Sequence, residues 1–162
     1  MKQQRLELNY EVYEDISELP EADAALLREA RGRTIQAYAP YSNFHVAAVA
    51  RMHNGKIVVG TNQENASYPV GICAERVLLG SAANLYPGEP IDAVAVTYAS
   101  KLAKSDHPIS PCGMCRQTLA EFETRLHQPI RLILGGMEGK VLVFPSASNL
   151  LPFAFSGTEL VS

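Results

Sequence analysis

The chain has 162 residues, which is within the usual size of a single domain with one hydrophobic core. Its net charge of −3 shows no excess of basic residues that would bind a polyanion, so nucleic acid is not an expected partner. No stretch approaches the about 18 apolar residues of a membrane span, and the polar amino end leads into no signal peptide, so no membrane partner is expected. Three cysteines are an odd number and fit a disulfide framework poorly, which favours reduced thiols and a cytoplasmic protein.

The first part of the sequence predicts a strand, a helix and a hairpin. Apolar and polar residues alternate from Leu6 to Val12, which is typical of a strand with one buried face. A helical pattern begins at Pro20 and ends before Pro40, because the residue before a proline avoids the helical conformation. Asn54-Gly55 predicts a hairpin turn, because both residue types tolerate positive φ. The predicted elements are a strand in 6–12, a helix in 20–39 and hairpin strands in 44–52 and 57–62.

The second part of the sequence predicts helices that alternate with strands. One helix should begin at Cys73 and another near Cys112. A helix, a hairpin and then alternating strands and helices indicate an α/β layer structure with a mixed sheet. We expect residues 21–162 to form a single domain, and residues 1–20 to be an amino-terminal extension that could add an edge strand. The predicted elements are helices in 73–84 and from 112 onward, strands in 91–98, 130–134 and 140–144, and a short helix in 146–155.

The three cysteines predict a metal site. Cys73 and Cys112 stand at helix starts, where the helix dipole favours thiolate over thiol. Cys115 lies one turn beyond Cys112 on the same helix face, so one ion can reach both sulfurs. A Cys-x-x-Cys pair alone would also suit a redox site, but that interpretation leaves Cys73 unexplained. A structural zinc site needs four protein ligands, and no histidine forms a recognisable ligand pair, so we expect a zinc site whose fourth position is open for water. The four histidines of the chain are His45, His53, His107 and His127.

Two charged residues follow Cys73 closely. Glu75 points away from the ligand face and can approach the open metal position from beside it, where a carboxylate could move the protons of water. The alternative role of Glu75 is a carboxylate that only favours the amino end of a helix. Arg76 lies three positions after Cys73 and faces the sulfurs, so its guanidinium can draw charge from three thiolates. The alternative for Arg76 is an ordinary solvated arginine.

Two motifs resemble the pattern of zinc deaminases, Cys73-Ala74-Glu75 and Pro111-Cys112-Gly113-Met114-Cys115. Beyond them, residues 22–160 resemble the small, all-cysteine, homotetrameric, zinc-dependent cytidine deaminases. This resemblance implies a three-layer αβα fold whose central mixed sheet has about five strands. The further matching stretches are Ala39-Pro40-Tyr41-Ser42-Asn43-Phe44, Asn62-Gln63-Glu64-Asn65-Ala66-Ser67-Tyr68, Arg116-Gln117 and Leu150-Leu151-Pro152-Phe153-Ala154-Phe155.

The resemblance also implies an activity, the hydrolytic deamination of cytidine and deoxycytidine to uridine and deoxyuridine plus ammonia, in pyrimidine salvage. It implies one Zn²⁺ per subunit and makes Glu75 the catalytic group that moves protons to N3 and to the leaving amine of cytosine. Asn62 and Glu64 lie two positions apart at a strand end and so project to one face, where they are implied to hold the ribose. We expect a homotetramer with shared active sites. The other implied substrate contacts are Phe44 with the pyrimidine ring, the backbone of Ala74 and Ser110 with the base, and Ala66, Tyr68 and Phe155 from a neighbouring subunit.

Three alternatives stay open at the level of the sequence. A deaminase of another aminated heterocycle, such as blasticidin S, shares the metal motif, and only the pair of Asn62 and Glu64 and the complete tail favour cytidine. A zinc-stabilised binding protein without catalysis is disfavoured by the presence of Glu75. A deaminase of nucleic-acid bases is disfavoured by the acidic net charge and by a first ligand that is cysteine rather than histidine.

Overall fold

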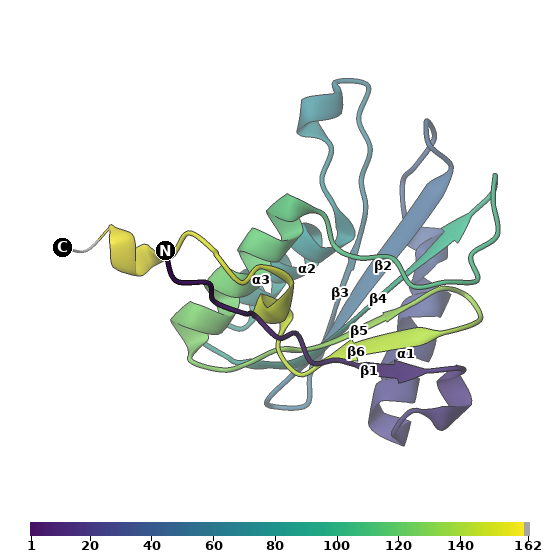
Figure 1. Cartoon of the computed structure of the whole chain (residues 1–162). Coiled ribbons are helices and arrows are strands. Elements are labelled where there is room, and N and C mark those ends of the chain that lie inside the picture. The colour runs from purple at the N-terminus through teal and green to yellow at the C-terminus, as the bar shows by residue number, and fades with distance from the viewer. Residues whose placement is uncertain (161–162) are drawn as a thin grey trace.

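The computed structural model describes residues 1–160 and shows a six-stranded mixed sheet between two layers of helices (Figure 1). The strand order is β1-β6-β5-β4-β2-β3, in which β4 and β5 are parallel and all other neighbours are antiparallel. Helix α1 covers one face, and α2 and α3 lie side by side on the other. This αβα arrangement confirms the expected fold class, with six strands where about five were expected. The elements are β1 (Glu11–Tyr13), α1 (Glu21–Arg33), β2 (Phe44–Met52), β3 (Ile57–Thr61), α2 (Ala74–Leu85), β4 (Ile91–Ser100), α3 (Gly113–Leu126), β5 (Arg131–Gly135) and β6 (Val141–Phe144).

Side chains of the central strand β4 alternate between the two faces of the sheet and define both cores. Val94 and Val96 lie in the core beneath α2 and α3, whereas Ala93 and Ala95 lie in the core beneath α1. All four side chains are almost completely buried. A strand with helices on both faces must be apolar on both, which explains why the sequence of β4 reads as a nearly continuous apolar run.

The contact between β3 and α2 sets the start of α2 directly against the sheet. Gly60 lies at this contact, and a Cβ atom there would be less than 3.0 Å from the carbonyl oxygen of Ala74 and from the backbone nitrogen of Leu78. Only glycine lets the helix backbone come this close to a strand. The close approach therefore fixes the position of the first turn of α2, which carries Glu75.

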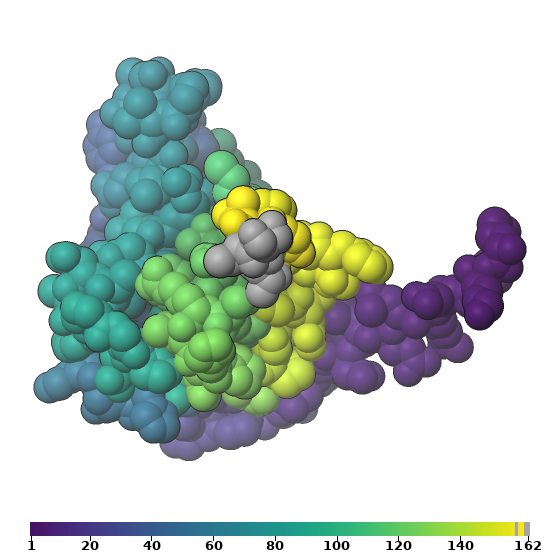
Figure 2. Space-filling view, turned by 90° about the vertical axis from the view of Figure 1, so that its left-hand side faces the viewer, coloured from purple at the N-terminus to yellow at the C-terminus, as the bar shows by residue number. Residues whose placement is uncertain are grey.

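The amino-terminal strand is shorter than the alternating sequence predicts. Strand β1 pairs with β6 at the edge of the sheet, whereas residues 1–10 form no regular structure and project from the body (Figure 2). Strand β6 has only 4 residues, so it offers pairing partners to few residues of the amino-terminal segment. Tyr10 still stacks on Phe144, with 5.3 Å between the ring centroids, but the apolar residues before it stay exposed.

Two other elements differ from the sequence-based expectation. Helix α1 ends at Arg33 and continues as a 3-10 turn over Thr34–Gln36, a common way for a helix to tighten at its end. The helix expected in 146–155 is a single 3-10 turn, η4, over Ala147–Leu150. The hairpin turn agrees with the expectation, because Gly55 adopts a φ of +78°. Within residues 1–160, no helix has the length and apolar character needed to cross a membrane.

Candidate active site

Three cysteine sulfurs meet where the amino ends of α2 and α3 come together. Cys73 precedes the first residue of α2, Cys112 precedes the first residue of α3, and Cys115 lies in the first turn of α3. The Sγ atoms of Cys73 and Cys112 are 3.8 Å apart, those of Cys112 and Cys115 are 3.5 Å apart, and all three lie within 4.8 Å of one another. A tetrahedral zinc ion with Zn–S bonds of about 2.3 Å would place its sulfurs about 3.8 Å apart. The three thiols therefore fit a zinc ion, and within residues 1–160 no histidine or carboxylate joins this cluster as a fourth ligand.

The electrostatics of the cluster also favour a bound cation. The hydrogen-bonding interaction with the Cys115 thiol lowers the pKa of Cys73 to about 6, and the same interaction raises the pKa of Cys115. The amino ends of two helices add positive potential at the sulfurs. Without a cation, however, three thiolates this close together would repel one another, and a divalent ion removes that repulsion.

The carboxyl group of Glu75 is buried beside the cysteine cluster. Its side chain is 5% exposed and belongs to the first turn of α2. Burial raises the pKa of this carboxyl group, because the charged form loses solvation. A carboxyl group in such a place can hold and release a proton beside a metal site.

Arg76 acts on the cluster through its charge. Its positive charge lowers the pKa of Cys73, although hydrogen bonding to Cys115 contributes more. Within the described part of the chain, Arg76 donates no hydrogen bond to any of the three sulfurs. The charge of Arg76 is thus the smallest of the influences on Cys73, and its expected action on the sulfurs stays a prediction.

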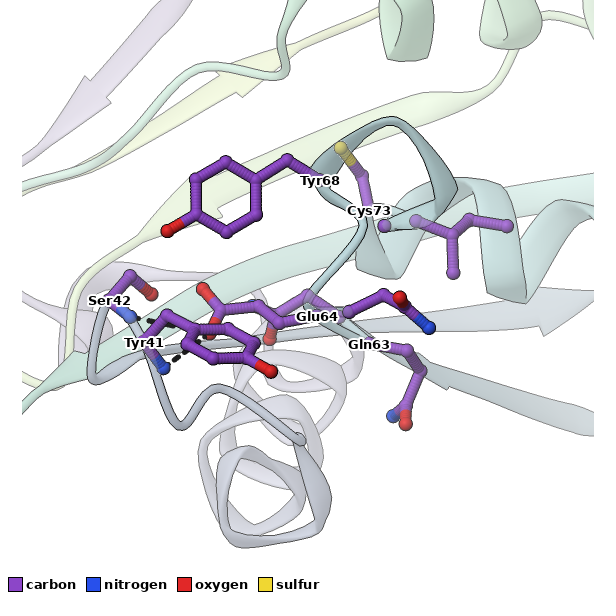
Figure 3. A pocket seen from close by; sticks show the side chains of 10 residues that line it. Tyr41, Ser42, Gln63, Glu64, Tyr68 and Cys73 are labelled. Atoms are coloured by element: carbon purple, nitrogen blue, oxygen red, sulfur yellow. Dashed lines mark hydrogen bonds between the residues drawn. The ribbon is translucent and has the colours of Figure 1, made fainter.

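A pocket of about 420 Å³ opens beside Cys73, within the about 300–1,000 Å³ that small-molecule sites commonly occupy. In Figure 3, Tyr68 and Cys73 stand on one side of this pocket and face Tyr41 and Glu64 on the other. The rings of Tyr41 and Tyr68 have centroids 5.9 Å apart. The lining residues are Tyr41, Ser42, Asn62, Gln63, Glu64, Asn65, Tyr68, Gly71, Ile72 and Cys73.

Glu64 faces this pocket and at the same time holds the loop before β2. Its Oε2 atom accepts hydrogen bonds from the backbone N–H groups of Tyr41, at 2.9 Å, and Ser42, at 3.3 Å (Figure 3). Hydrogen bonding by the side chain of Ser42 is the main cause that lowers the pKa of Glu64. The carboxylate is therefore kept charged at the rim of the pocket.

Asn62 lines the same pocket, but its amide is already engaged with β2. Its Nδ2 donates to the carbonyl oxygen of Phe44 at 2.9 Å, and its Oδ1 accepts from the backbone N–H of Val46 at 2.8 Å. One N–H and one lone pair of the amide remain for another partner. The ring of Phe44 stacks on Tyr98, with 4.7 Å between centroids and an interplanar angle of 22°.

The structure does not bring all expected substrate residues into this one pocket. Ala74 is completely buried at the start of α2, and Ser110 is exposed just before the buried Pro111. Tyr68 borders the pocket of its own chain, whereas Ala66 and Phe155 lie outside its lining. These positions leave the expected roles in a neighbouring subunit as predictions.

Sequence reasoning assigned no role to several residues that line the pocket. Tyr41 and Ser42 belong to the loop between Pro40 and Asn43, and Asn43 has a φ of +54°. A proline and an asparagine around two polar residues indicate a tight turn, but not which side chain the turn would contact. That contact, with Glu64, joins segments 23 residues apart.

Comparison with known proteins agrees with this geometry. Residues 20–127 match the family model described as the cytidine and deoxycytidylate deaminase zinc-binding region. The chain is 36% identical over 135 residues to a cytidine deaminase of Halalkalibacterium halodurans, an alignment that covers 83% of this chain and 95% of that protein. It is 31% identical over 114 residues to the blasticidin-S deaminase of Bacillus cereus, with 69% of this chain and 77% of that protein covered.

A crystal structure of cytidine deaminase from Burkholderia pseudomallei superposes on this fold with a TM-score of 0.70. The two sequences are 42% identical, and the match covers 81% of this chain and 97% of that chain. The two cytidine deaminases thus align over nearly their whole length with this chain. The three clustered thiols could hold a metal ion, in agreement with the zinc-binding region that the family model describes. The chain belongs to the cytidine and deoxycytidylate deaminase family and is a zinc-binding deaminase.

Proposed function

We propose that this enzyme hydrolyses the exocyclic amine of cytidine and deoxycytidine, giving uridine or deoxyuridine and ammonia, as a step of pyrimidine salvage. The observation that carries the proposal is a buried carboxyl group, that of Glu75, beside three clustered thiols, one of which, that of Cys73, lines a pocket. Several relatives that match most of the chain are named cytidine deaminase, which supports this choice of substrate.

Cys73, Cys112 and Cys115 would hold one Zn²⁺ per subunit. The donor set supports this role, because three thiolates with sulfur separations of 3.8 and 3.5 Å suit zinc and leave its fourth position free. When bound there, zinc supplies a Lewis acid that makes a water molecule nucleophilic at neutral pH. Arg76 reduces the excess negative charge that three sulfurs place on the site.

Glu75 would carry the protons of the reaction. Its carboxylate takes a proton from the attacking water and delivers it to N3 of cytosine as the oxygen bonds to C4. It then takes the remaining proton from the new hydroxyl group on C4 and passes it to the amine. The C4–N bond breaks, the leaving group departs as neutral ammonia, and the oxygen stays on C4 as the carbonyl of uridine. The position of Glu75, two residues from Cys73 and shielded from solvent, supports this role.

Asn62 and Glu64, which line the pocket, would orient the nucleoside together with Phe44, Ala74 and Ser110, which lie outside its lining. Phe44 packs against the pyrimidine ring, and Asn62 and Glu64 bind the ribose hydroxyl groups. Glu64 suits this role because the N–H groups of the preceding loop hold its carboxylate at the pocket. The backbone of Ala74 and Ser110 would hydrogen-bond the base. Buried polar partners of this kind reject analogues that cannot pair with them.

The active enzyme would be a homotetramer in which Ala66, Tyr68 and Phe155 complete the pocket of a neighbouring subunit. Tyr68 is 75% exposed and Phe155 is 61% exposed in the single chain, and large exposed aromatic side chains commonly mark contact surfaces. Residues 21–162 would form the catalytic domain and residues 1–20 an extension of it. The proposal includes a cytoplasmic location and no nucleic-acid or membrane partner.

Loss of absorbance in the cytosine band tests the substrate, with cytidine, deoxycytidine and blasticidin S offered separately to the purified enzyme. We expect loss of absorbance with both pyrimidine nucleosides and little with blasticidin S. Turnover of blasticidin S alone would assign the chain to the second kind of deaminase instead. Zinc binding without ammonia release from any of the three compounds would favour a binding protein.

A further inference from the structure

Helix α3 holds the segment that follows β6, residues 146–155, which we call the C-terminal tail. In Figure 2 the yellow tail lies against the green α3. The Glu123 side chain is only 9% exposed, and its carboxylate anchors the start of the tail. It accepts hydrogen bonds from the backbone N–H groups of Ala147, at 2.8 Å, and Ser148, at 3.1 Å. The hydroxyl groups of Ser146 and Ser148 also donate to this carboxylate. The start of the tail is therefore tied to the carboxyl-terminal half of α3.

Gln117, near the amino end of α3, anchors the far end of the tail. Its Nε2 donates to the carbonyl oxygen of Phe155 at 2.8 Å. Phe155 itself remains largely exposed, so this hydrogen bond holds the backbone and leaves the ring free. Among the hydrogen bonds of the described residues, Gln117 makes none to residues 110–112, the segment that leads into the cysteine at the start of α3 and that we call the zinc loop.

Arg116 holds the tail and the zinc loop at once. Its Nε donates to the carbonyl oxygen of Pro111 at 2.8 Å, and its Nη1 donates to the carbonyl oxygen of Leu150 at 3.2 Å. Pro111 is buried and is joined directly to Cys112, while Arg116 directly follows Cys115. One guanidinium thus connects the peptide before one expected zinc ligand with the middle of the tail.

This connection needs the shape of arginine and not only its charge. The planar guanidinium offers five N–H donors in fixed directions, so it can bond two carbonyl groups from separate segments simultaneously. A lysine ammonium group carries the same charge on a flexible stem without that fork. Within residues 1–160 Arg116 forms no salt bridge, so its donors serve backbone carbonyl groups rather than a carboxylate.

We propose that Arg116 is a positioning residue that couples zinc binding at the cysteine cluster to docking of the C-terminal tail on α3. Zinc fixes Cys112 and, with it, the Pro111 carbonyl group, which in turn orients the guanidinium toward Leu150. By thermodynamic linkage, a docked tail must strengthen zinc binding by the same factor by which zinc strengthens docking. The coupling concerns the metal site and stands whichever nucleoside the enzyme accepts.

Zinc affinity, measured by competition with a chromogenic chelator, tests the first half of the coupling. Arg116→Gln should weaken zinc binding by about 10- to 100-fold, the usual effect of losing a partner that orients a metal ligand. Arg116→Lys should behave in the same way, because lysine keeps the charge but lacks the fixed N–H donors that bond two carbonyl groups at once. The matched control is Gln117→Ala, which removes only the hydrogen bond to Phe155 and leaves both bonds of Arg116, to Pro111 and Leu150, in place. Because the coupling runs through Leu150 and not through Phe155, this variant should keep its zinc affinity. Unchanged affinity in Arg116→Gln would overturn the proposal.

Hydrogen exchange of the tail with and without zinc tests the second half. The reporter is the N–H of Leu151, which donates to the carbonyl oxygen of Ser148 at 2.9 Å, and strand β4 serves as the internal reference. Removing zinc from the parent enzyme should speed exchange at Leu151 more than in β4. In Arg116→Gln, exchange at Leu151 should be fast with zinc or without it. An equal response to zinc in the parent and in Arg116→Gln would show that the tail and the metal site are independent.

Discussion

The amide of Asn62, at the end of β3, donates to the carbonyl oxygen of Phe44, the first residue of β2, at 2.9 Å. The Oδ1 atom of the same amide accepts a hydrogen bond from the backbone N–H of Val46 at 2.8 Å. The backbone carbonyl oxygen of Asn62 accepts a hydrogen bond from the N–H of Tyr38 at 3.0 Å. The backbone N–H of Asn62 still donates to the carbonyl oxygen of Val46 at 3.2 Å, so the side chain adds to the backbone pairing with β2 and extends it to Phe44. Asn62 therefore fixes the backbone of Phe44 in addition to the ribose contact that we propose for it.

Replacing Asn62 by alanine should affect both stability and substrate binding. The substitution leaves the Phe44 carbonyl and the Val46 N–H, both partly buried, without partners. An unsatisfied group costs about 1–3 kcal/mol when it is fully buried, which is an upper bound for each of these two. We expect a lower free energy of unfolding in urea and a raised KM for cytidine, because the ring of Phe44 loses its fixed position. A raised KM with unchanged stability would mean that the amide serves the substrate alone.

The hydrogen bonds that Glu64 accepts from the loop before β2 should be lost below a certain pH. Hydrogen bonding by Ser42, followed by the backbone of Tyr41, lowers the folded-state pKa of Glu64 below its ordinary 4.5. A carboxyl group with a lowered folded pKa stabilises the fold above its unfolded pKa, and this contribution is lost as the pH falls through the folded value. The hydrogen bonds to Tyr41 and Ser42 should therefore persist at pH 4.5 and be lost only in more acidic solution.

The amide chemical shift of Tyr41, followed by NMR during an acid titration, would measure this limit. The N–H of Lys56 is a suitable control, because it donates at 3.0 Å to the side chain of Asn54, which does not titrate. In Glu64→Gln the transition at Tyr41 should disappear while Lys56 is unaffected. A transition of Tyr41 above pH 4.5 in the parent protein would contradict the prediction.

The metal site was largely predictable from sequence because its parts are local. Cys112 and Cys115 lie on one turn, and Cys73 and Glu75 lie on another, so helix geometry alone sets each pair. The two turns meet because α2 packs on α3. The spacing of the residues does not predict this packing, whereas the resemblance to a known family implies it.

Other features depend on distant partners and could not be predicted locally. The short β1 follows from the length of β6, and the engagement of Asn62 follows from the path of residues 38–46. The 3-10 turn in the tail reflects Glu123, which accepts N–H groups of Ala147 and Ser148 across 24 and 25 residues of sequence. In each case a long-range contact overrides the local preference of the chain.

Replacing Glu75 by glutamine should abolish catalysis while zinc stays bound. The amide keeps the shape of the side chain but cannot carry a proton between water and substrate, and such groups contribute about 100- to 10,000-fold to a rate. Ammonia release should fall by at least about 100-fold, while zinc content, measured by mass spectrometry, should equal that of the parent. Glu121→Gln, which removes an exposed charge from α3, is the control and should keep full activity.

If Glu75→Gln retained most of its ammonia release, the proton-carrying role would have to move to another group. If it lost zinc as well as activity, the carboxylate would belong to the metal site rather than to proton transfer. Measuring zinc content and rate on the same preparation separates these outcomes.

Gly60, in β3 against the start of α2, and Gly80, within α2, offer a matched pair of Gly→Ala substitutions. At Gly60 a methyl group would meet the helix backbone at Ala74 and Leu78, whereas at Gly80 nothing lies within 4 Å of the added carbon. Gly60→Ala should therefore push the start of α2 away from β3, lower the free energy of unfolding by about 1–3 kcal/mol and weaken zinc binding through Cys73. Gly80→Ala should stabilise the enzyme by up to about 1 kcal/mol, because alanine is the better helix former. Urea unfolding and chelator competition on both variants would test this, and equal zinc affinities would show that the close approach at Gly60 does not position the metal site.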